Sequence, residues 1–115
     1  METASFVGVD RNSENAEDIY RFRNTRTEGY FYTASETERD FVRDNLDEFI
    51  FEDVAFSAFE TNVNNSIPVY RFFDENTGVH FYTADETERT FVEDNLLNYN
   101  SEGIAFYALP VAEII

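Results

Sequence analysis

Hydrophobic and polar positions alternate along the chain in a way that predicts two β-hairpins. The first joins residues 19–23 to residues 30–33, and the second joins residues 69–73 to residues 80–83. Both arms of each pair are rich in aromatic and β-branched residues, which favour strands. Polar turn residues separate the arms, with Gly78 ending the second turn. A third strand is predicted later in each segment, over 53–59 and 103–109.

The sequence predicts a helix between each hairpin and the third strand. Ser35 with Glu38, or Thr33 with Glu36, forms a capping box, the arrangement that opens many helices. In the second segment Thr83 with Glu86 keeps this box, and Asp85 offers a carboxylate cap instead. Each helix then carries an apolar stripe on one face. The stripes consist of Phe41, Val42 and Leu46, and of Phe91, Val92 and Leu96.

The two segments are copies of one unit. When the sequence is shifted by 50 positions, about half of residues 19–59 are identical to residues 69–109. Phe31-Tyr32-Thr33-Ala34, for example, falls on Phe81-Tyr82-Thr83-Ala84. Ala4-Ser5-Phe6 lies 50 residues before Val54-Ala55-Phe56, so residues 1–18 are interpreted as the closing strand of a preceding unit plus a loop.

These elements predict the α+β class with mostly antiparallel sheet. The expected architecture is two tandem strand–strand–helix–strand repeats, 19–59 and 69–109, with an extra N-terminal strand. A unit of about 40 ordered residues is marginal alone, so both are expected to share one core within a single domain, 1–115.

Composition and charge limit the classes of partner. The 115 residues contain no apolar run of the ~20 residues that a transmembrane helix requires, and no cysteine, which removes disulfides and zinc–thiolate sites. Asp and Glu total 24 against 8 basic residues, giving a formal net charge of −16. Such a surface repels nucleic-acid phosphates and anionic membranes, so neither is an expected partner.

Several motifs in fixed order resemble a known repeat. They include Tyr70-Arg71-Phe72-Phe73, Gly78-Val79-His80-Phe81-Tyr82-Thr83 and Glu102-Gly103-Ile104-Ala105-Phe106-Tyr107-Ala108. Together they resemble an uncharacterised tandem-repeat family of secreted bacterial and fungal proteins, often found beside hydrolase or surface-anchoring domains. The resemblance implies an accessory module located outside the cell or at its surface. Neighbouring domains of a larger protein are the partners that it implies.

The first unit departs from this pattern at the positions of His80 and two glycines. Tyr30 replaces the histidine, while Glu28 and Asp53 stand where the second unit has Gly78 and Gly103. Glycine permits backbone geometry and close approach that other residues do not. If these residues frame a site, only the second unit retains it.

Strand alternation places an arginine, a histidine and aromatic side chains on one face of the second unit. The candidate ligand-binding residues are Arg71, His80, Tyr82 and Tyr107, which suit stacking on a sugar ring and hydrogen bonding to its hydroxyls. The competing interpretation is that this face packs against the neighbouring unit, with Arg71 paired to a carboxylate such as Glu102. Tyr70, Phe72, Phe81, Ile104, Phe106 and Ala108 are assigned to the opposite face, the core.

Catalytic and metal sites have weaker support. His80 is the single histidine and has no nucleophile motif beside it, and the glutamates at the helix starts have a capping role. Asp74-Glu75-Asn76-Thr77-Gly78 lacks the EF-hand spacing and is interpreted as a hairpin turn. No catalytic residue, cofactor or metal ligand is therefore assigned.

The function expected from the sequence is that of a non-catalytic extracellular module. It would bind a surface glycan or polysaccharide as an accessory to an enzyme or an adhesin. The alternative is a structural spacer or protein-interaction module in a longer array of repeats, with no small ligand.

Overall fold

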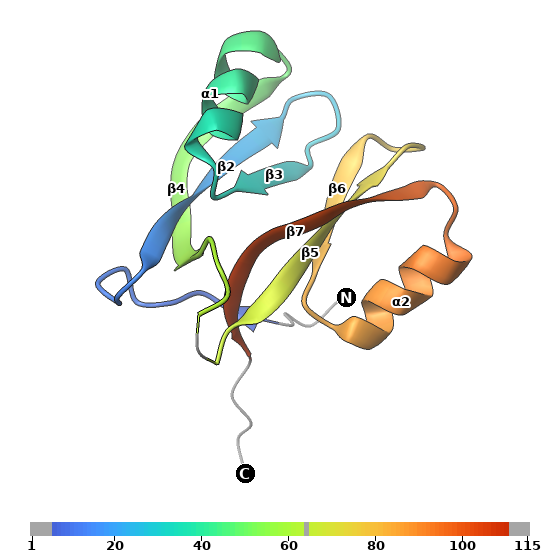
Figure 1. Cartoon of the computed structure of the whole chain (residues 1–115). Coiled ribbons are helices and arrows are strands. Elements are labelled where there is room, and N and C mark those ends of the chain that lie inside the picture. Colours follow the sequence, from blue (N-terminus) through green and yellow to red (C-terminus); the bar gives the residue numbers. More distant parts are fainter. Residues whose placement is uncertain (1–5, 64, 111–115) are drawn as a thin grey trace.

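The computed structural model describes residues 6–63 and 65–110 and contains seven strands and two short helices within them (Figure 1). In chain order these elements are β1 (Phe6–Val7), β2 (Ala16–Asn24), β3 (Tyr30–Thr33), α1 (Glu36–Asn45), β4 (Phe49–Phe59), β5 (Ile67–Asp74), β6 (Val79–Thr83), α2 (Glu86–Asn95) and β7 (Tyr99–Pro110). Neither helix in this part of the chain is long and apolar enough to cross a membrane.

The strands form one antiparallel sheet in the order β3-β2-β4-β7-β5-β6, and β1 pairs with β7. We call β2, β3, α1 and β4 the N-terminal half, and β5, β6, α2 and β7 the C-terminal half. The two hairpins pair in the same register, since Arg21 lies opposite Tyr32 and Arg71 opposite Tyr82. Figure 1 shows the helices well apart, each beside the strands of its own half.

The expected α+β class is wrong: the protein is mostly antiparallel β-sheet. Strands account for 50% and helices for only 19% of the described residues. The difference arises mainly in β4 and β7, which begin at Phe49 and Tyr99, four residues before the predicted third strands. Polar residues and a left-handed residue in each of these strands resemble loop sequence, although the strand continues through them.

The two helices begin at caps among those that the sequence offers. The Ser35 side chain accepts a hydrogen bond from the Glu38 amide at 3.1 Å, and Asp85 accepts from the amides of Thr87 and Glu88. Thr33 instead accepts from the amide of Ser35, one step before the helix. Ser35 and Asp85 are therefore the N-caps of α1 and α2.

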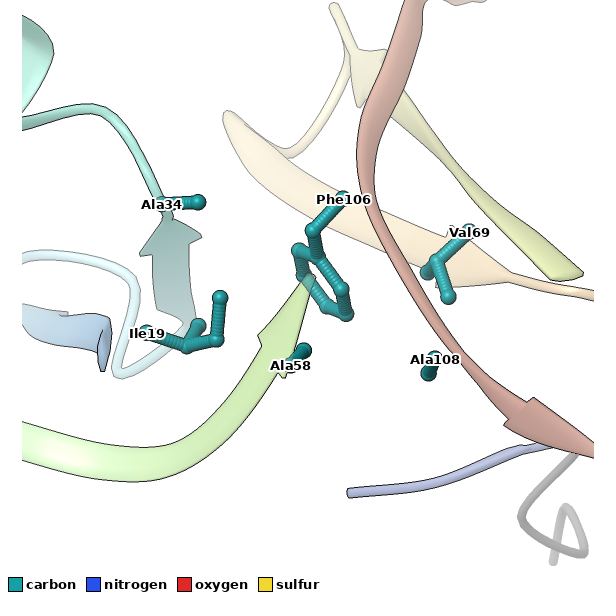
Figure 2. Close-up of a cluster of buried hydrophobic side chains, with 6 residues drawn as sticks. All are labelled: Ile19, Ala34, Ala58, Val69, Phe106 and Ala108. Carbon is teal, nitrogen blue, oxygen red and sulfur yellow. The ribbon is translucent and has the colours of Figure 1, made fainter. Parts of the chain in front are cut away.

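A buried apolar cluster lies between the halves. Phe106 occupies its centre, with small or branched side chains from both halves around it (Figure 2). Tyr32, Phe56 and Tyr82 pack against the cluster from its edges. The six buried members are Ile19, Ala34, Ala58, Val69, Phe106 and Ala108. Because both halves contribute, separating them would expose apolar surface on each.

Bulges in β7 change which side chains face the core. Tyr70 lies opposite Ile104 but Val69 lies opposite Phe106, so β7 holds one extra residue between these pairs. An extra residue reverses the alternation of side chains beyond it. Ile104, expected in the core, is consequently 46% exposed, whereas Phe106 is fully buried.

Candidate functional site at the junction of the halves

Arg71 links the two halves through a network of charged contacts. Its guanidinium donates two hydrogen bonds of 3.1 Å to the Glu38 carboxylate of α1, and Nε donates one of 2.7 Å to Glu102 of β7. It also lies 4.8 Å from the centre of the Phe31 ring. Two carboxylates and an aromatic ring therefore fix the planar guanidinium in place. The pairing of Arg71 with Glu102 is the contact that the packing interpretation specified.

Glu38 is the partner that the sequence interpretation missed. Burial raises the pKa of the Glu38 carboxyl, but hydrogen bonds from Arg71 and Thr33 and the Arg71 charge outweigh it, so this pKa lies below its usual value. Glu38 is therefore ionised at neutral pH. Its backbone amide does take part in the predicted cap, whereas its carboxylate is used by the other half.

His80 lies beside this network with little access to solvent. Its Nε2 is 3.4 Å from Oε1 of Glu102, and its ring centre is 4.9 Å from that of Phe31. Burial lowers the pKa of His80, and the nearby Arg71 charge adds to this, against the opposing charges of Glu102 and Glu38. The imidazole is therefore neutral at pH 7 and presents hydrogen-bonding nitrogen atoms without a charge.

A cavity of about 190 Å³ opens where these side chains meet α1. Arg71, His80 and Glu102 from the C-terminal half form one wall. The other wall belongs to the N-terminal half and consists of Phe31, Glu38, Phe41, Val42, Leu46 and Phe49. A second cavity of about 360 Å³ shares His80 and Glu102 with the first, so the two are neighbours. We call this pair of cavities the junction cleft.

Tyr82, a predicted ligand-binding residue, is a packing residue. Its hydroxyl accepts a hydrogen bond of 2.7 Å from the Tyr32 amide and donates one of 3.1 Å to the Tyr32 carbonyl. Burial raises the pKa of Tyr82 well above its usual value, so the hydroxyl stays protonated. It satisfies backbone groups of β3 at the edge of the sheet and lines neither cavity of the junction cleft.

Tyr107 also lies outside the junction cleft. It is half-buried in β7, opposite Pro68 of β5 and Phe59 of β4, and lines neither cavity of the junction cleft. Of the four predicted ligand-binding residues, the structure brings Arg71, His80 and Tyr82 together, since Arg71 interacts with both of the others, but only Arg71 and His80 line the junction cleft. Tyr82 and Tyr107 belong to the packing between strands.

The glycine positions do not distinguish the two halves as expected. Asp53 and Glu28 adopt positive φ angles of 71° and 64°, close to the 82° of Gly103 and the 75° of Gly78. The Asp53 side chain supports its own conformation by accepting a hydrogen bond from the Val54 amide. No atom lies within 4 Å of a Cβ built on Gly103, so this glycine is not required for close approach.

The turn at residues 74–78 is organised by hydrogen bonds among its own residues and a neighbour. Asp74 accepts from the Asn76 amide, the Thr77 hydroxyl and the Asn98 side chain. These bonds lower the pKa of the Asp74 carboxyl, the bond from Asn98 contributing most. Across residues 6–63 and 65–110, no three His, Cys, Asp or Glu side chains are grouped so as to hold a metal ion.

Comparison with known families identifies the chain at the level of its domain. The model of the domain of unknown function DUF5648 matches residues 2–109. The chain belongs to the DUF5648 family. No curated protein and no solved structure gives a significant match. The junction cleft of this DUF5648 domain is thus described from its own residues.

Proposed function

We propose that this DUF5648 domain is a non-catalytic extracellular module that binds a surface glycan in the junction cleft. The observation that carries the proposal is the position of Phe41. Its side chain is 57% exposed, although it lines the same cavity as Glu38, His80 and Glu102. An exposed ring beside carboxylates and a neutral imidazole is the combination that recognises a sugar, whose faces are apolar and whose rim carries hydroxyls.

The polar groups suit hydroxyl ligands better than charged ones. Glu38 and Glu102 can accept hydrogen bonds from hydroxyls, and Arg71 offsets one of their two negative charges. His80 offers a nitrogen that stays neutral at pH 7 because burial lowers its pKa. A phosphate or a carboxylate would meet the one negative charge that Arg71 leaves uncompensated, so the proposed ligand is a neutral glycan.

The experiment compares two matched phenylalanines. Phe41 and Phe91 lie at the same place in α1 and α2, and they are 57% and 56% exposed. Only Phe41 shares a cavity with His80 and Glu102. Binding to insoluble cell-wall polysaccharides and to a glycan array is measured for the natural chain, Phe41→Ala and Phe91→Ala.

The expected result is that Phe41→Ala lowers retention at least tenfold while Phe91→Ala stays near the natural value. Thermal melting verifies that both variants are folded, because removing an exposed ring costs little stability. Equal retention by the natural chain and Phe41→Ala contradicts the proposal. So does the absence of retention on every neutral polysaccharide tested.

The second candidate function is a structural or protein-interaction module without a small ligand, a repeat unit within a longer secreted protein. The contacts of Arg71 and Tyr82 favour it, since both side chains bind groups of the other half. Under this function, Phe41 and Phe91 are contact residues for neighbouring units and neither substitution alters glycan retention. The same experiment therefore separates the two candidates.

A further inference from the structure

Three strands meet at one point of the fold in matching pairs. Phe59 of β4 lies opposite Tyr107 of β7, and Leu109 of β7 lies opposite Val7 of β1. Val9, just after β1, lies opposite Ser57 of β4. Each strand thus pairs with its two neighbours through residues two positions apart. These are residues 57 and 59 for β4, 107 and 109 for β7, and 7 and 9 for the segment that contains β1. The three strands close a ring of equivalent contacts.

The side chains at the centre of this ring repeat the same relation. Phe6, Phe56 and Phe106 are separated by 50 residues in sequence, and their rings contact one another pairwise. The centre-to-centre distances are 6.4, 5.8 and 5.6 Å. Residues 6–9 therefore occupy the third position of a threefold arrangement whose other two positions hold β4 and β7.

Only two of the three positions carry a hairpin and a helix among the described residues. β4 is accompanied by β2, β3 and α1, and β7 is accompanied by β5, β6 and α2. β1 is followed directly by β2, and residues 6–9 pair only with β7 and β4 within the described part of the chain. The third position is thus represented by its innermost strand alone.

The two surfaces that face the third position are complementary to each other. The groove at α2 has a volume of about 210 Å³ and is lined, residue for residue 50 positions later, like the α1 wall of the junction cleft. Its lining consists of Phe81, Glu88, Phe91, Val92, Leu96 and Tyr99. What it lacks is the wall that Arg71, His80 and Glu102 supply at α1.

The counterparts of that missing wall belong to the N-terminal half. Arg21, Tyr30 and Glu52 correspond in position to Arg71, His80 and Glu102. The Arg21 side chain is 38% exposed against 13% for Arg71, and Tyr30 is 42% exposed. Within the described residues, the ion pair of Arg21 is with Glu52 of its own half. Among the described residues, this surface therefore presents an arginine that has no counterpart of Glu38, the helical glutamate that binds Arg71.

We infer that these two surfaces form one docking site for a third strand–strand–helix segment of the sequence type found at residues 66–100. Such a segment would place its arginine on Glu88 and receive Arg21 on its own glutamate, reproducing the Arg71–Glu38 contact at both new junctions. It would also pair with the edge of residues 6–9 that no other strand of the described residues covers, as β2 pairs with β4. The Arg71–Glu38 contact, which the protein already makes once, thus specifies what kind of segment would occupy the site.

A fusion in register tests this inference. Met1 lies two 50-residue spacings before Ser101, so the two residues occupy equivalent positions. A second copy of residues 66–100 is therefore joined directly ahead of Met1 without a linker. The fusion is expected to be monomeric by light scattering. Its Tm should exceed that of the natural chain by about 5 °C or more, because the docked segment buries the Phe81–Phe91 groove.

Charge reversal at Arg21 shows whether the segment docks as inferred. Arg21→Glu should lower the Tm of the natural chain by about 5 °C or less, since the side chain is 38% exposed there, and lower that of the fusion several times as much. Arg71→Glu is the control and should destabilise both proteins alike. Equal effects of Arg21→Glu in both proteins overturn the inference, as does a fused segment that is degraded by protease while the remainder stays folded.

Two further outcomes also decide the question. A second fusion, with residues 16–50 ahead of Met1, keeps the same register with the other natural sequence. If neither fusion folds, the third position does not accept such a segment and the inference fails. If the natural chain is itself a dimer that Arg21→Glu dissociates, a second copy occupies the surfaces and the inferred occupant is wrong.

Discussion

Arg21 and Arg71 occupy the same position in the two halves, and the difference between them shows how one sequence pattern acquires two roles. Each lies opposite a tyrosine of the neighbouring strand. Arg71 additionally contacts Glu38 and Phe31 of the other half, whereas the ion pair of Arg21 is with Glu52 of its own half. The local sequence determines the strand and the direction of the side chain, and the adjacent half determines what the side chain binds.

The largest expected effect in this comparison follows from removing each arginine. Arg71→Ala leaves Glu38 and Glu102 partly buried without their cation, so it should lower the free energy of unfolding by about 2–4 kcal/mol. Arg21→Ala removes a partly exposed arginine and leaves Glu52 paired with Arg23, so it should cost about 1 kcal/mol or less. Urea denaturation of both variants measures the difference. Equal losses would show that the junction network contributes no more than a surface pair.

The hairpins and the helix caps could be predicted because their signals are local. Alternating apolar residues and the turn at Gly78 lie within a few positions of the hydrogen bonds that they specify. The fold class could not be predicted in this way. Asp53 and Gly103 adopt the left-handed conformation inside β4 and β7, and sequence patterns at such residues suggest that a strand ends rather than bulges.

The candidate site was predictable only in part for a related reason. His80 stands out because the first half has Tyr30 at the same place, and Arg71 could be selected because strand alternation places it on the same face as His80. Glu38 does not stand out, since Glu88 occupies the same place in an almost identical helix. Only the packing of one half against the other makes Glu38 an arginine ligand, and that packing leaves no trace in the helix sequence.

The tyrosines of β3 and β6 provide the second comparison. Tyr82→Phe removes the hydroxyl that bonds both backbone groups of Tyr32. It should cost about 1–2 kcal/mol, because the Tyr32 amide loses this partner and the carbonyl keeps the weaker 3.4 Å bond from Arg71. Tyr32→Phe, at the same position of the other hairpin, keeps the ring against the buried cluster and loses only the hydroxyl contact with the partly exposed Arg21, so it should cost less than about 0.5 kcal/mol. Thermal melts of the two variants test this. A larger loss in Tyr32→Phe would contradict the packing role assigned to Tyr82.

The left-handed residues of β4 and β7 give a smaller effect, which differs in size between the two halves. Gly103→Ala introduces a Cβ at φ 82° and should destabilise the protein by about 1 kcal/mol. Asp53→Gly relieves the strain of φ 71° but loses the side-chain bond to the Val54 amide, so it should change stability by less than about 0.5 kcal/mol. If Gly103→Ala is as neutral as Asp53→Gly, the left-handed geometry is not required for β7.

The smallest expected effect concerns His80, which stands where the N-terminal half has Tyr30. Burial lowers the pKa of His80 in the folded protein, against the opposing charges of Glu102 and Glu38 and with the help of Arg71. As the pH falls through the usual value of about 6.5, the unfolded chain therefore binds a proton that the folded chain does not. The free energy of unfolding should fall between pH 7 and pH 5.5, above the range in which the carboxyl groups titrate.

Because His80 is the single histidine, His80→Gln should flatten this part of the stability profile measured by urea denaturation, while Tyr30→Phe should leave its slope unchanged. A natural chain whose stability rises as the pH falls through this window would mean that the pair with Glu102 outweighs burial, and His80 would then enter the junction cleft as a cation.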